Sequence, residues 1–444
     1  MKKSNRLTLF IFVAMVLGII LGYIINQMYG GDTKVALDGN NIKITRQAGD
    51  LVKEAANEAS LKKFADNISI LTDIFLRLVK MIIAPLVFST LVVGVAKLGD
   101  IRAVGRIGGK TMLWFISATF VSLFLGLVLV NVMQPGVSLG LPLPDIHAAT
   151  GVSKADMTLK GFFHHVFPDS VVMAMAHNEI LQIVVFAIFF GVATASIGEL
   201  GTPVVKLMDS VAHIMLKVTG FVMNFAPFAV FGAMAAIIAQ KGLGILLTYG
   251  VFILQFYIGL ACLWLLLALA GFFVMGRAVF PLLGRIRNPV LLAFGTASSE
   301  AAYPRTMEEL EKFGCDNRIV SFVLPLGYSF NLDGSMMYMT FASLFIAQAY
   351  GMHLPMDQQI TMLLVLMITS KGIAGVPRAS LVVIAGTLSM FKIPEAGLLL
   401  LLGVDHLLDM GRSATNVIGN AMATAVVSKW EKAWNPPADL YQKQ

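Results

Sequence analysis

The sequence predicts an all-α membrane protein, and three observations support this fold class. Of the 444 residues, 57% are hydrophobic and only 13% are charged, a balance unlike that of soluble domains. Three stretches contain no Asp, Glu, Lys, Arg or His, and each exceeds the roughly 20 residues that cross a bilayer as a helix: residues 7–31, 111–144 and 242–276. A membrane β-barrel would instead show strands of about 10 residues with alternating apolar and polar side chains.

The first apolar stretch is expected to remain as a membrane span. Its apolar run is longer than the core of a cleavable signal peptide, and no small-residue cleavage site follows it. Basic residues cluster in short loops, and such loops are typically cytoplasmic. We therefore expect both termini on the cytoplasmic side, and we attribute the net charge of +7 to loop bias rather than to a nucleic-acid partner.

The chain changes character near residue 276. Before it, the apolar segments are long, and the polar stretch 32–66 is expected to form a long external loop. After it, the apolar segments become short and are interrupted by Gly, Pro, Ser and charged residues. The conventional spans are expected at residues 7–31, 68–98, 104–134, 166–198, 203–240 and 242–276.

Two interrupted stretches share one layout, "LLAFGTASSEAAYP" (291–304) and "ITSKGIAGVPRASLVVIAG" (368–386). Each has an apolar arm, a tip of small residues with one Pro, and a second arm. Irregular backbone at membrane depth is tolerated only inside protein or beside a watery cavity, and a pair of such segments indicates a transporter's binding site. We interpret them as re-entrant hairpins whose helix ends approach an anion; the alternative is ordinary loops or small-residue packing faces.

Between the hairpins lies "YSFNLDGSMMY" (328–338), which places a carboxylate in an apolar span. Asn331 and Gly334 weaken a helix, and Asp333 would cost about 3 kcal/mol in lipid. An unwound turn solves both problems, because its carbonyls and the carboxylate together can hold a small cation. The alternative is an Asn331–Asp333 pair that is hydrogen-bonded for packing.

The last span, "VDHLLDMGRSATNVIGN" (404–420), carries polar residues at spacings of 4, 3, 4 and 4. On a helix, Asp405, Asp409, Arg412, Asn416 and Asn420 therefore form one stripe. Three ionised groups in lipid would cost on the order of 8–10 kcal/mol, so the stripe faces protein or solvent. Asp409 could bind an ammonium and Arg412 a carboxylate; the alternative is a structural pair between these two residues.

Together, these motifs are similar to those of the glutamate transporter family, the dicarboxylate/amino acid:cation symporters, and most of all to bacterial proton/glutamate symporters. The resemblance implies eight transmembrane helices plus two re-entrant helical hairpins, assembled as a homotrimer in the bacterial inner membrane. It implies an elevator-type transporter with no enzymatic activity and no cofactor. The matching segments are "SSE", "NLDG", "SKGIAGVP", "D-x-x-x-D-M-G-R-x-x-x-N" and "LVKMIIAPLVFSTLVVGV" (78–95).

The resemblance also divides the chain into a fixed scaffold and a moving transport domain. The scaffold would comprise residues 7–98 (spans 1 and 2) and 145–240 (spans 4 and 5). The transport domain would comprise span 3 at 104–134, span 6 at 242–276, and the core at 277–430.

By the same resemblance, Ser298 and Ser299 match the tip of the first hairpin, which binds substrate carboxylate. Val376 matches the tip of the second hairpin, which closes over the substrate. Ser335 stands where threonine is usual, one hydroxyl in place of another. Arg378 and Ser380 depart from the pattern, because small residues are usual at both positions; for Arg378 we favour a solvated side chain over an anion attractant.

The last span supplies the remaining substrate ligands implied by the resemblance: Asp409 for the ammonium, Arg412 for the side-chain carboxylate and Asn416 to complete the site. Neutral amino-acid members tend to lack the arginine, and C4-dicarboxylate members tend to lack the acid at Asp409. This sequence has both. We therefore expect an acidic amino acid, glutamate or aspartate, as the substrate.

The coupling ion is expected to be a proton, because ligands of the sodium-coupled pattern are missing. Asn420 replaces an aspartate, while Phe115, Ala118 and Thr119 stand where tyrosine, threonine and serine are found. These changes remove oxygen ligands that a hard cation needs.

The candidate proton carriers are Glu300, Asp333 and Asp405, since a desolvated carboxylate can bind a proton near neutral pH. No metal site is certain, but sodium stays possible at Asn331 and Asp333, with Ser329 and the second-hairpin carbonyls.

Three alternatives remain open from the sequence. The first two are sodium-coupled symport of acidic amino acids and symport of C4-dicarboxylates. The third is an anion channel, which can also hold charged residues within its bundle. An enzyme is not expected, because we find neither a nucleophile–base pair nor a set of metal ligands.

Overall fold

The computed structural model describes residues 3–29, 48–98, 101–137, 143–144, 166–242, 249–370, 379–402 and 404–437. Within these ranges the chain is helical, and the β-type pairing recorded there is one isolated bridge between Cys315 and Trp434. The predicted all-α class is therefore confirmed. Among the described residues, five helical stretches are long and apolar enough to cross a membrane: Leu9–Tyr29, Asn57–Lys97, Arg102–Met133, Gly198–Lys241 and Gly250–Thr296.

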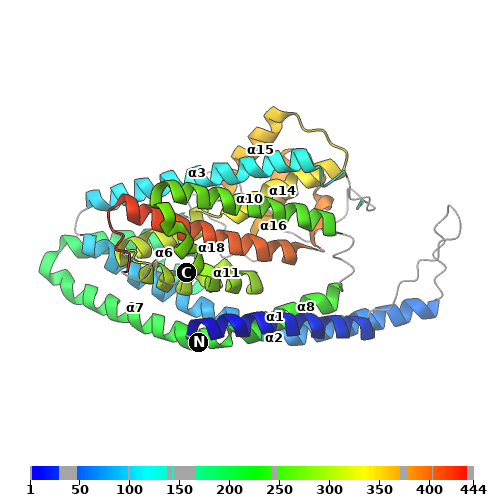
Figure 1. The fold of residues 1–444 in the computed structure, drawn as a ribbon, viewed down its shortest axis with the longest axis horizontal. Helices are drawn as coiled ribbons and strands as arrows, with labels where there is room; N and C mark the ends of the chain where they lie inside the picture. The colour runs from blue at the N-terminus through cyan, green and yellow to red at the C-terminus, as the bar shows by residue number, and fades with distance from the viewer. Residues whose placement is uncertain are drawn as a thin grey trace. The chain divides into compact units, whose positions relative to one another are not determined.

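The helices follow the chain in the order shown in Figure 1. The α-helices of the first half are α1 (Lys3–Tyr29), α2 (Ala48–Leu98), α3 (Ile101–Met133), α5 (Val171–His177), α6 (Ile180–Ser196), α7 (Thr202–Val222) and α8 (Ala226–Lys241). Those of the second half are α10 (Gly250–Met275), α11 (Val279–Thr296), α12 (Ser299–Lys312), α13 (Asn317–Phe330), α14 (Asp333–Ala349), α15 (Met356–Thr369), α16 (Ala379–Met390), α17 (Leu398–Leu402) and α18 (Asp405–Trp430).

The expectation of an external loop over 32–66 is wrong for its second part. Helix α2 begins at Ala48, about five turns before the predicted span at 68. Residues 48–66 are rich in Ala, Leu, Glu and Lys, which are strong helix formers, but they are too polar to be recognised as a span. Leu61 and Ala65, one turn apart, are buried. Residues 32–47 lie outside the described part.

The structure divides into two compact units, and the first comprises residues 1–77 and 223–248. Within it, α1 runs along α8 (Figure 1). Two glycines of α1 allow this close approach, because a Cβ atom at Gly18 would lie 2.6 Å from the Phe231 oxygen and Gly22 is equally crowded. The Asn26 side-chain amide donates a hydrogen bond to the Ala239 carbonyl oxygen at 2.8 Å, and this partly buried contact links the two helices.

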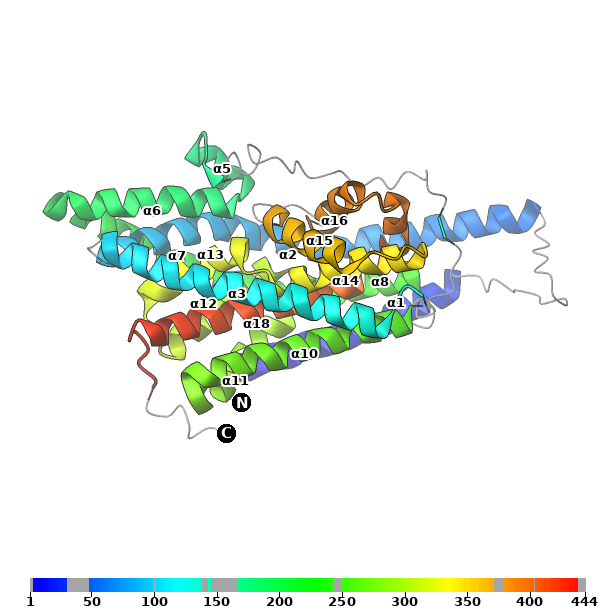
Figure 2. The same ribbon diagram turned by 90° about the horizontal axis from the view of Figure 1, so that it is seen from above.

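The second unit comprises residues 78–222 and 249–444, and α18 is its central element. Helix α18 contacts α3 and each of α10 to α14 (Figure 2). Its residues from Ser413 to Ser428 are all buried. The polar stripe predicted for this helix therefore faces protein on the inside of the unit rather than lipid.

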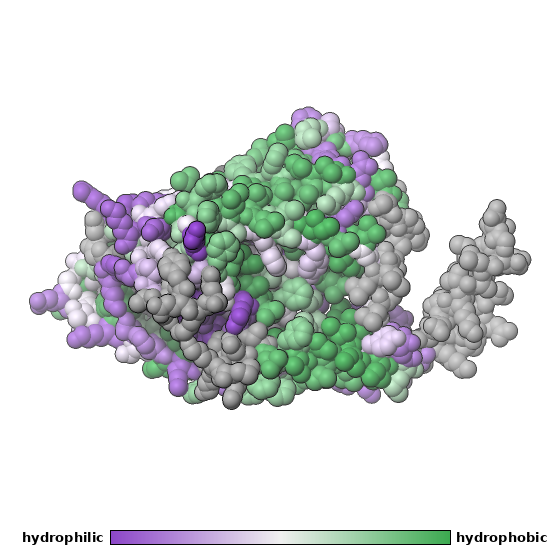
Figure 3. Space-filling model, in the orientation of Figure 1, coloured by the Kyte–Doolittle hydropathy of each residue, from purple (hydrophilic) through white to green (hydrophobic). Residues whose placement is uncertain are grey.

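One face of α3 is apolar and exposed, as expected for a helix that contacts lipid. Its exposed residues Leu113, Ile116, Phe120 and Phe124 recur every three or four positions. Hydrophobic side chains cover this part of the surface over α3 and α10 (Figure 3). The opposite face of α3 is buried and carries Phe115, Ala118, Thr119 and Ser122.

An ion cluster fixes the end of α18 to the start of α3. Glu431 follows α18, and its carboxylate lies 2.9 Å from Arg106 and 2.6 Å from Lys110. The hydrogen bond from Arg106, followed by that from Lys110, lowers the pKa of the Glu431 carboxyl below its ordinary value. Glu431 is therefore ionised at neutral pH, and the cluster holds the two helix ends together.

Candidate substrate and ion site

The first interrupted stretch forms a helical hairpin from α11 and α12. Helix α11 ends at Thr296, Ala297 takes a left-handed conformation with φ 49°, and α12 begins at Ser299. Ser298 caps α12, since its hydroxyl oxygen accepts a hydrogen bond from the Ala301 N–H at 3.3 Å. The predicted two arms and tip are present here, with Ser298 and Ser299 at the tip and partly exposed, and re-entry of this hairpin into the membrane stays a prediction.

The second interrupted stretch also forms two arms, α15 and α16, which contact each other. Its tip, residues 371–378, lies outside the described residues, and so do the predicted gate residue Val376 and the unusual Arg378.

The helix break predicted around Asn331 is present. Helix α13 ends at Phe330, Asn331 and Leu332 are not helical, and α14 begins at Asp333. Asp333 therefore occupies the first turn of α14, where the positive end of the helix dipole favours a carboxylate. The break also frees backbone groups that an unbroken helix would consume.

The last predicted span is one continuous helix, α18, and its stripe faces this break. Asn416 makes the closest connection: its Oδ1 accepts hydrogen bonds from the backbone N–H of Gly334 at 2.9 Å and of Ser335 at 3.3 Å. These are two of the N–H groups that the start of α14 leaves without helical partners. The Asn416 amide therefore joins the two halves of the site.

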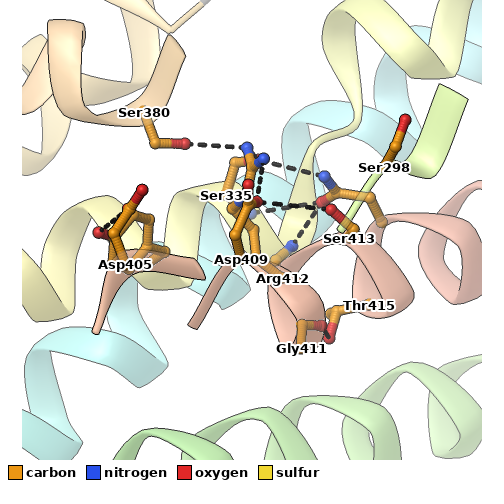
Figure 4. Close-up of polar contacts among 12 residues, drawn as sticks. Ser298, Ser335, Ser380, Asp405, Asp409, Gly411, Arg412, Ser413 and Thr415 are labelled. Atoms are coloured by element: carbon orange, nitrogen blue, oxygen red, sulfur yellow. Dashed lines mark hydrogen bonds and ion pairs between the residues drawn. The ribbon is translucent and has the colours of Figure 1, made fainter. Parts of the chain in front are cut away.

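The substrate candidates Ser335, Asp409 and Arg412 form one contact group (Figure 4). Asn416 joins it, because its Nδ2 donates to Ser335 Oγ at 3.1 Å. Arg412 donates from Nε to the Asp409 carboxylate, with which it also forms an ion pair. Its Nη1 donates to Ser335 Oγ at 3.1 Å and to Ser380 Oγ at 3.0 Å. About a fifth of the Asp409 and Arg412 side chains is exposed, 20% and 18% respectively, so this group can be reached from outside the protein.

A second group lies deeper and contains the ion candidates Asn331, Asp333 and Asn420. The Asn331 amide donates to Asp333 Oδ2 at 3.1 Å and to Asn420 Oδ1 at 3.2 Å. Ser122 of α3 donates to Asp333 Oδ1 at 3.5 Å. All four side chains are at most 1% exposed. Among the described atoms, Asn331 Oδ1 has no hydrogen-bond partner, although buried polar atoms normally have one.

Glycines allow α18 to approach this group closely. A Cβ atom at Gly419 would overlap the Asp333 carboxylate, and one at Gly334 would overlap the Arg412 carbonyl oxygen. Asp333 can therefore occupy its observed position only because Gly419 of α18 has no side chain.

Gly419→Ala is expected to lower the free energy of unfolding by about 1–3 kcal/mol, because the new methyl group overpacks the buried carboxylate. The midpoint of thermal unfolding in detergent micelles measures this effect. Gly284→Ala is the matched control: Gly284 lies inside α11 with nothing within 4 Å of its added Cβ, so it should be neutral or slightly stabilising. Equal midpoints for the two variants would contradict the proposed crowding.

The structure does not gather all predicted ion residues around Asp333. Asp405 accepts a hydrogen bond from the Tyr338 hydroxyl at 2.7 Å. Glu300 lines a narrow space with Tyr303 and Tyr328. Ser329 is 1% exposed, and its hydroxyl has no hydrogen-bond partner within the described structure.

Four contacting residues of the described structure were not among the predicted ligands: Ser122, Ser380, Tyr338 and Ser413. Ser122 lies one turn beyond Ala118 and Thr119, so the helical spacing of α3 could have indicated it. The sequence marks Ser380 only as a departure from the small residue usual at its position. No spacing rule pointed to Tyr338, because its partner Asp405 is 67 residues away.

A helix broken next to a buried carboxylate, a helical hairpin and a stripe with opposite charges are typical of secondary membrane transporters. The profile of the sodium:dicarboxylate symporter family matches residues 7–430, and the chain belongs to this family. It is thus a multi-pass membrane protein from a family of symporters, not of enzymes.

Similar proteins with assigned names fall into two groups. The chain is 40% identical over 381 residues to a proton/sodium-glutamate symport protein of Geobacillus stearothermophilus, which covers 84% of this chain and 90% of that protein. It is 38% identical over 428 residues to a protein of the same name from Bacillus caldotenax, covering 94% of both. It is 42% identical over 370 residues to a C4-dicarboxylate transport protein of Laribacter hongkongensis, covering 82% of this chain and 83% of that protein.

Proposed function

We propose that this protein is a secondary active symporter that imports glutamate or aspartate together with protons. The observation that carries the proposal is the pair of opposite charges formed by Asp409 and Arg412, one turn apart on α18 and partly exposed. A substrate with one ammonium and two carboxylates can use both members of this pair.

The Asp409–Arg412 ion pair is neutral as a whole, because its two opposite charges compensate each other. An acidic amino acid that separates them brings an ammonium to Asp409 and a carboxylate to Arg412, so each charge keeps a counter-charge. A C4-dicarboxylate could replace Asp409 at Arg412 but would leave the Asp409 carboxylate beside a second anion. Burying a charge without a partner is costly, and this cost favours the amino acid.

Transport of C4-dicarboxylates stays a second candidate, because similar proteins carry that name at comparable identity. Uptake of glutamate, aspartate and succinate by the same proteoliposomes separates the two candidates. We expect accumulation of both amino acids and little accumulation of succinate. Strong uptake of succinate, together with no uptake of glutamate or aspartate, would overturn the substrate assignment.

The proton proposal rests on Asp333, which is 0% exposed and lies within hydrogen-bond distance of the uncharged side chains of Asn331 and Ser122. A buried carboxylate needs either a proton or a cation to offset its charge. The amide at Asn420 offers one oxygen and already accepts a hydrogen bond from Asn331. A specific observation favours sodium as the alternative, since the buried Asn331 Oδ1 has no partner among the described atoms and could bind a cation.

Imposed gradients test the coupling ion. Labelled glutamate is offered to proteoliposomes under an inward proton gradient without sodium and, separately, under an inward sodium gradient at equal pH. We expect accumulation with the proton gradient alone. Accumulation only with sodium would establish the alternative, and uptake that never exceeds equilibrium under either gradient would indicate a channel.

Asp333→Asn tests the proton carrier directly. The variant cannot bind and release a proton at this position, so the pH dependence of glutamate uptake should flatten, and the maximal rate should fall about tenfold or more. Asp66→Asn is the control, because Asp66 is an exposed acid of α2. An unchanged pH dependence of uptake in Asp333→Asn would exclude Asp333 as the proton carrier. The same measurement would then be made on the amide variants of Asp405 and Glu300.

The larger organisation is part of the same proposal. We infer eight transmembrane helices and two re-entrant hairpins in a bacterial inner membrane, with both termini in the cytoplasm. The scaffold, 7–98 and 145–240, would hold a homotrimer while residues 104–134 and 242–430 carry the substrate by an elevator movement. Mass measurement of the purified protein tests the trimer, and labelling of cysteines introduced near each terminus tests the orientation.

A further inference from the structure

The Arg412 guanidinium has a partner that carboxylate binding alone does not require. Ser380 lies in the first turn of α16, and its Oγ accepts a hydrogen bond from Arg412 Nη1 at 3.0 Å. The serine is 3% exposed. Figure 4 shows it reaching Arg412 from α16, a helix separate from the one that carries the arginine. One bond therefore connects the second arm of the hairpin to α18.

The hydrogen bonds of Arg412 fix the plane of its guanidinium group. An arginine presents five N–H donors in a rigid planar fork. The Nε side faces Asp409, and Nη1 makes two bonds, one to Ser335 and one to Ser380. Because these partners come from α18, α14 and α16, the fork cannot turn about its stem without breaking at least one bond.

The two serine hydroxyls each keep a hydrogen that can be donated. Ser335 Oγ accepts from Arg412 and also from Asn416 Nδ2 at 3.1 Å, so both its acceptor positions are used. Ser380 Oγ accepts from Arg412. Beside the cationic fork there are consequently two O–H donors, and a carboxylate has about four acceptor positions to receive them.

We propose that Ser380 is a positioning residue for the Arg412 guanidinium and a further ligand of the carboxylate that binds there. Its hydroxyl orients the fork in the empty site and donates a hydrogen bond to the distal carboxylate of the substrate in the loaded site. The inference rests on the proposed function, in which Arg412 binds that carboxylate. It adds a ligand from α16, so the bound carboxylate would connect α14, α16 and α18.

Three variants test this inference in proteoliposomes. Ser380→Ala removes the hydroxyl, Ser380→Thr keeps it, and Ser389→Ala makes the same change at an exposed position of the same helix. The KM and the maximal rate are measured for glutamate, aspartate and succinate with each variant. Equal elution in size-exclusion chromatography checks that all variants are folded.

Ser380→Ala is expected to raise the KM about tenfold for every substrate that presents a carboxylate to Arg412, the effect of one lost hydrogen bond to a charged group. The maximal rate should change by less than about twofold, because the lost contact is a binding contact. Ser380→Thr should restore the wild-type KM, and Ser389→Ala should not alter it.

A wild-type KM in Ser380→Ala would overturn the inference, and so would a loss of maximal rate in both Ser380→Ala and Ser380→Thr with the KM unchanged. These outcomes differ from failure of the proposed function. If the wild-type protein transports succinate but neither amino acid, the substrate assignment fails, yet Ser380 is still tested by the KM for succinate.

Discussion

Arg412→Gln is expected to abolish accumulation of glutamate and aspartate, with a loss of about 100-fold or more in initial uptake. The guanidinium lies at the centre of the substrate contact group and is itself partly exposed, and its ion pair with Asp409 and its bonds to Ser335 and Ser380 hold it in place. A neutral amide loses both the charge and the planar fork, and charge-assisted bidentate bonds are among the strongest in proteins. Initial rates of labelled uptake at low substrate concentration measure the loss.

Two controls separate loss of recognition from loss of folding. Arg412→Lys keeps the charge without the fork, so it should retain weak uptake with a raised KM. Arg287→Gln removes an exposed arginine of α11 and should transport normally. Because Arg412→Gln leaves Asp409 without its cation, the double variant Asp409→Asn/Arg412→Gln should fold better than the single one. Unchanged glutamate uptake in Arg412→Gln would refute the assignment of the carboxylate ligand.

Asp409→Asn should separate amino acids from dicarboxylates. The amide cannot offer a negative charge to the substrate ammonium, so glutamate and aspartate uptake should fall about 10- to 100-fold. Succinate has no ammonium, and removal of the neighbouring carboxylate should leave its uptake unchanged or increase it. The ratio of glutamate to succinate uptake in the variant, compared with the same ratio in the wild-type protein, measures the effect.

Ser413 provides the matched control for this substitution. Its hydroxyl lies 3.5 Å from the Asp409 carboxylate, but it carries no charge, so Ser413→Ala should lower both uptakes by less than about threefold. An equal loss of glutamate and succinate uptake in Asp409→Asn would contradict the ammonium role and point instead to a structural pair with Arg412.

Periodicity correctly predicted α18 and its polar stripe. Spacings of three and four place Asp405, Asp409, Arg412, Asn416 and Asn420 on one face of any α-helix, whatever surrounds it. The cost of charges in lipid then required this face to point toward protein or solvent. In the structure Asp405, Asn416 and Asn420 are buried, while Asp409 and Arg412 are partly exposed. The break at Asn331 was predictable for a similar reason, because an Asn, an Asp and a Gly in an apolar run oppose a continuous membrane helix.

The start of α2 is not predicted by apolar length or by the cost of charges in lipid. Residues 48–66 are helical but polar, and a search for spans detects apolar length, not helical propensity. The predicted domain boundaries, and the substrate and ion roles of the individual residues, stay predictions to be tested by the experiments above.

By itself, the sequence determined local features of this protein: its membrane class, its all-α character, the polar stripe of α18 and the break before Asp333. Local spacing and the cost of burying charge suffice for each of them. Only the tertiary structure decided that Ser380 and Ser335 share the Arg412 fork, and that Ser122 reaches Asp333. These partners are separated by 32, 77 and 211 residues, and at such separations contact depends on how the helices pack rather than on any repeat along the chain.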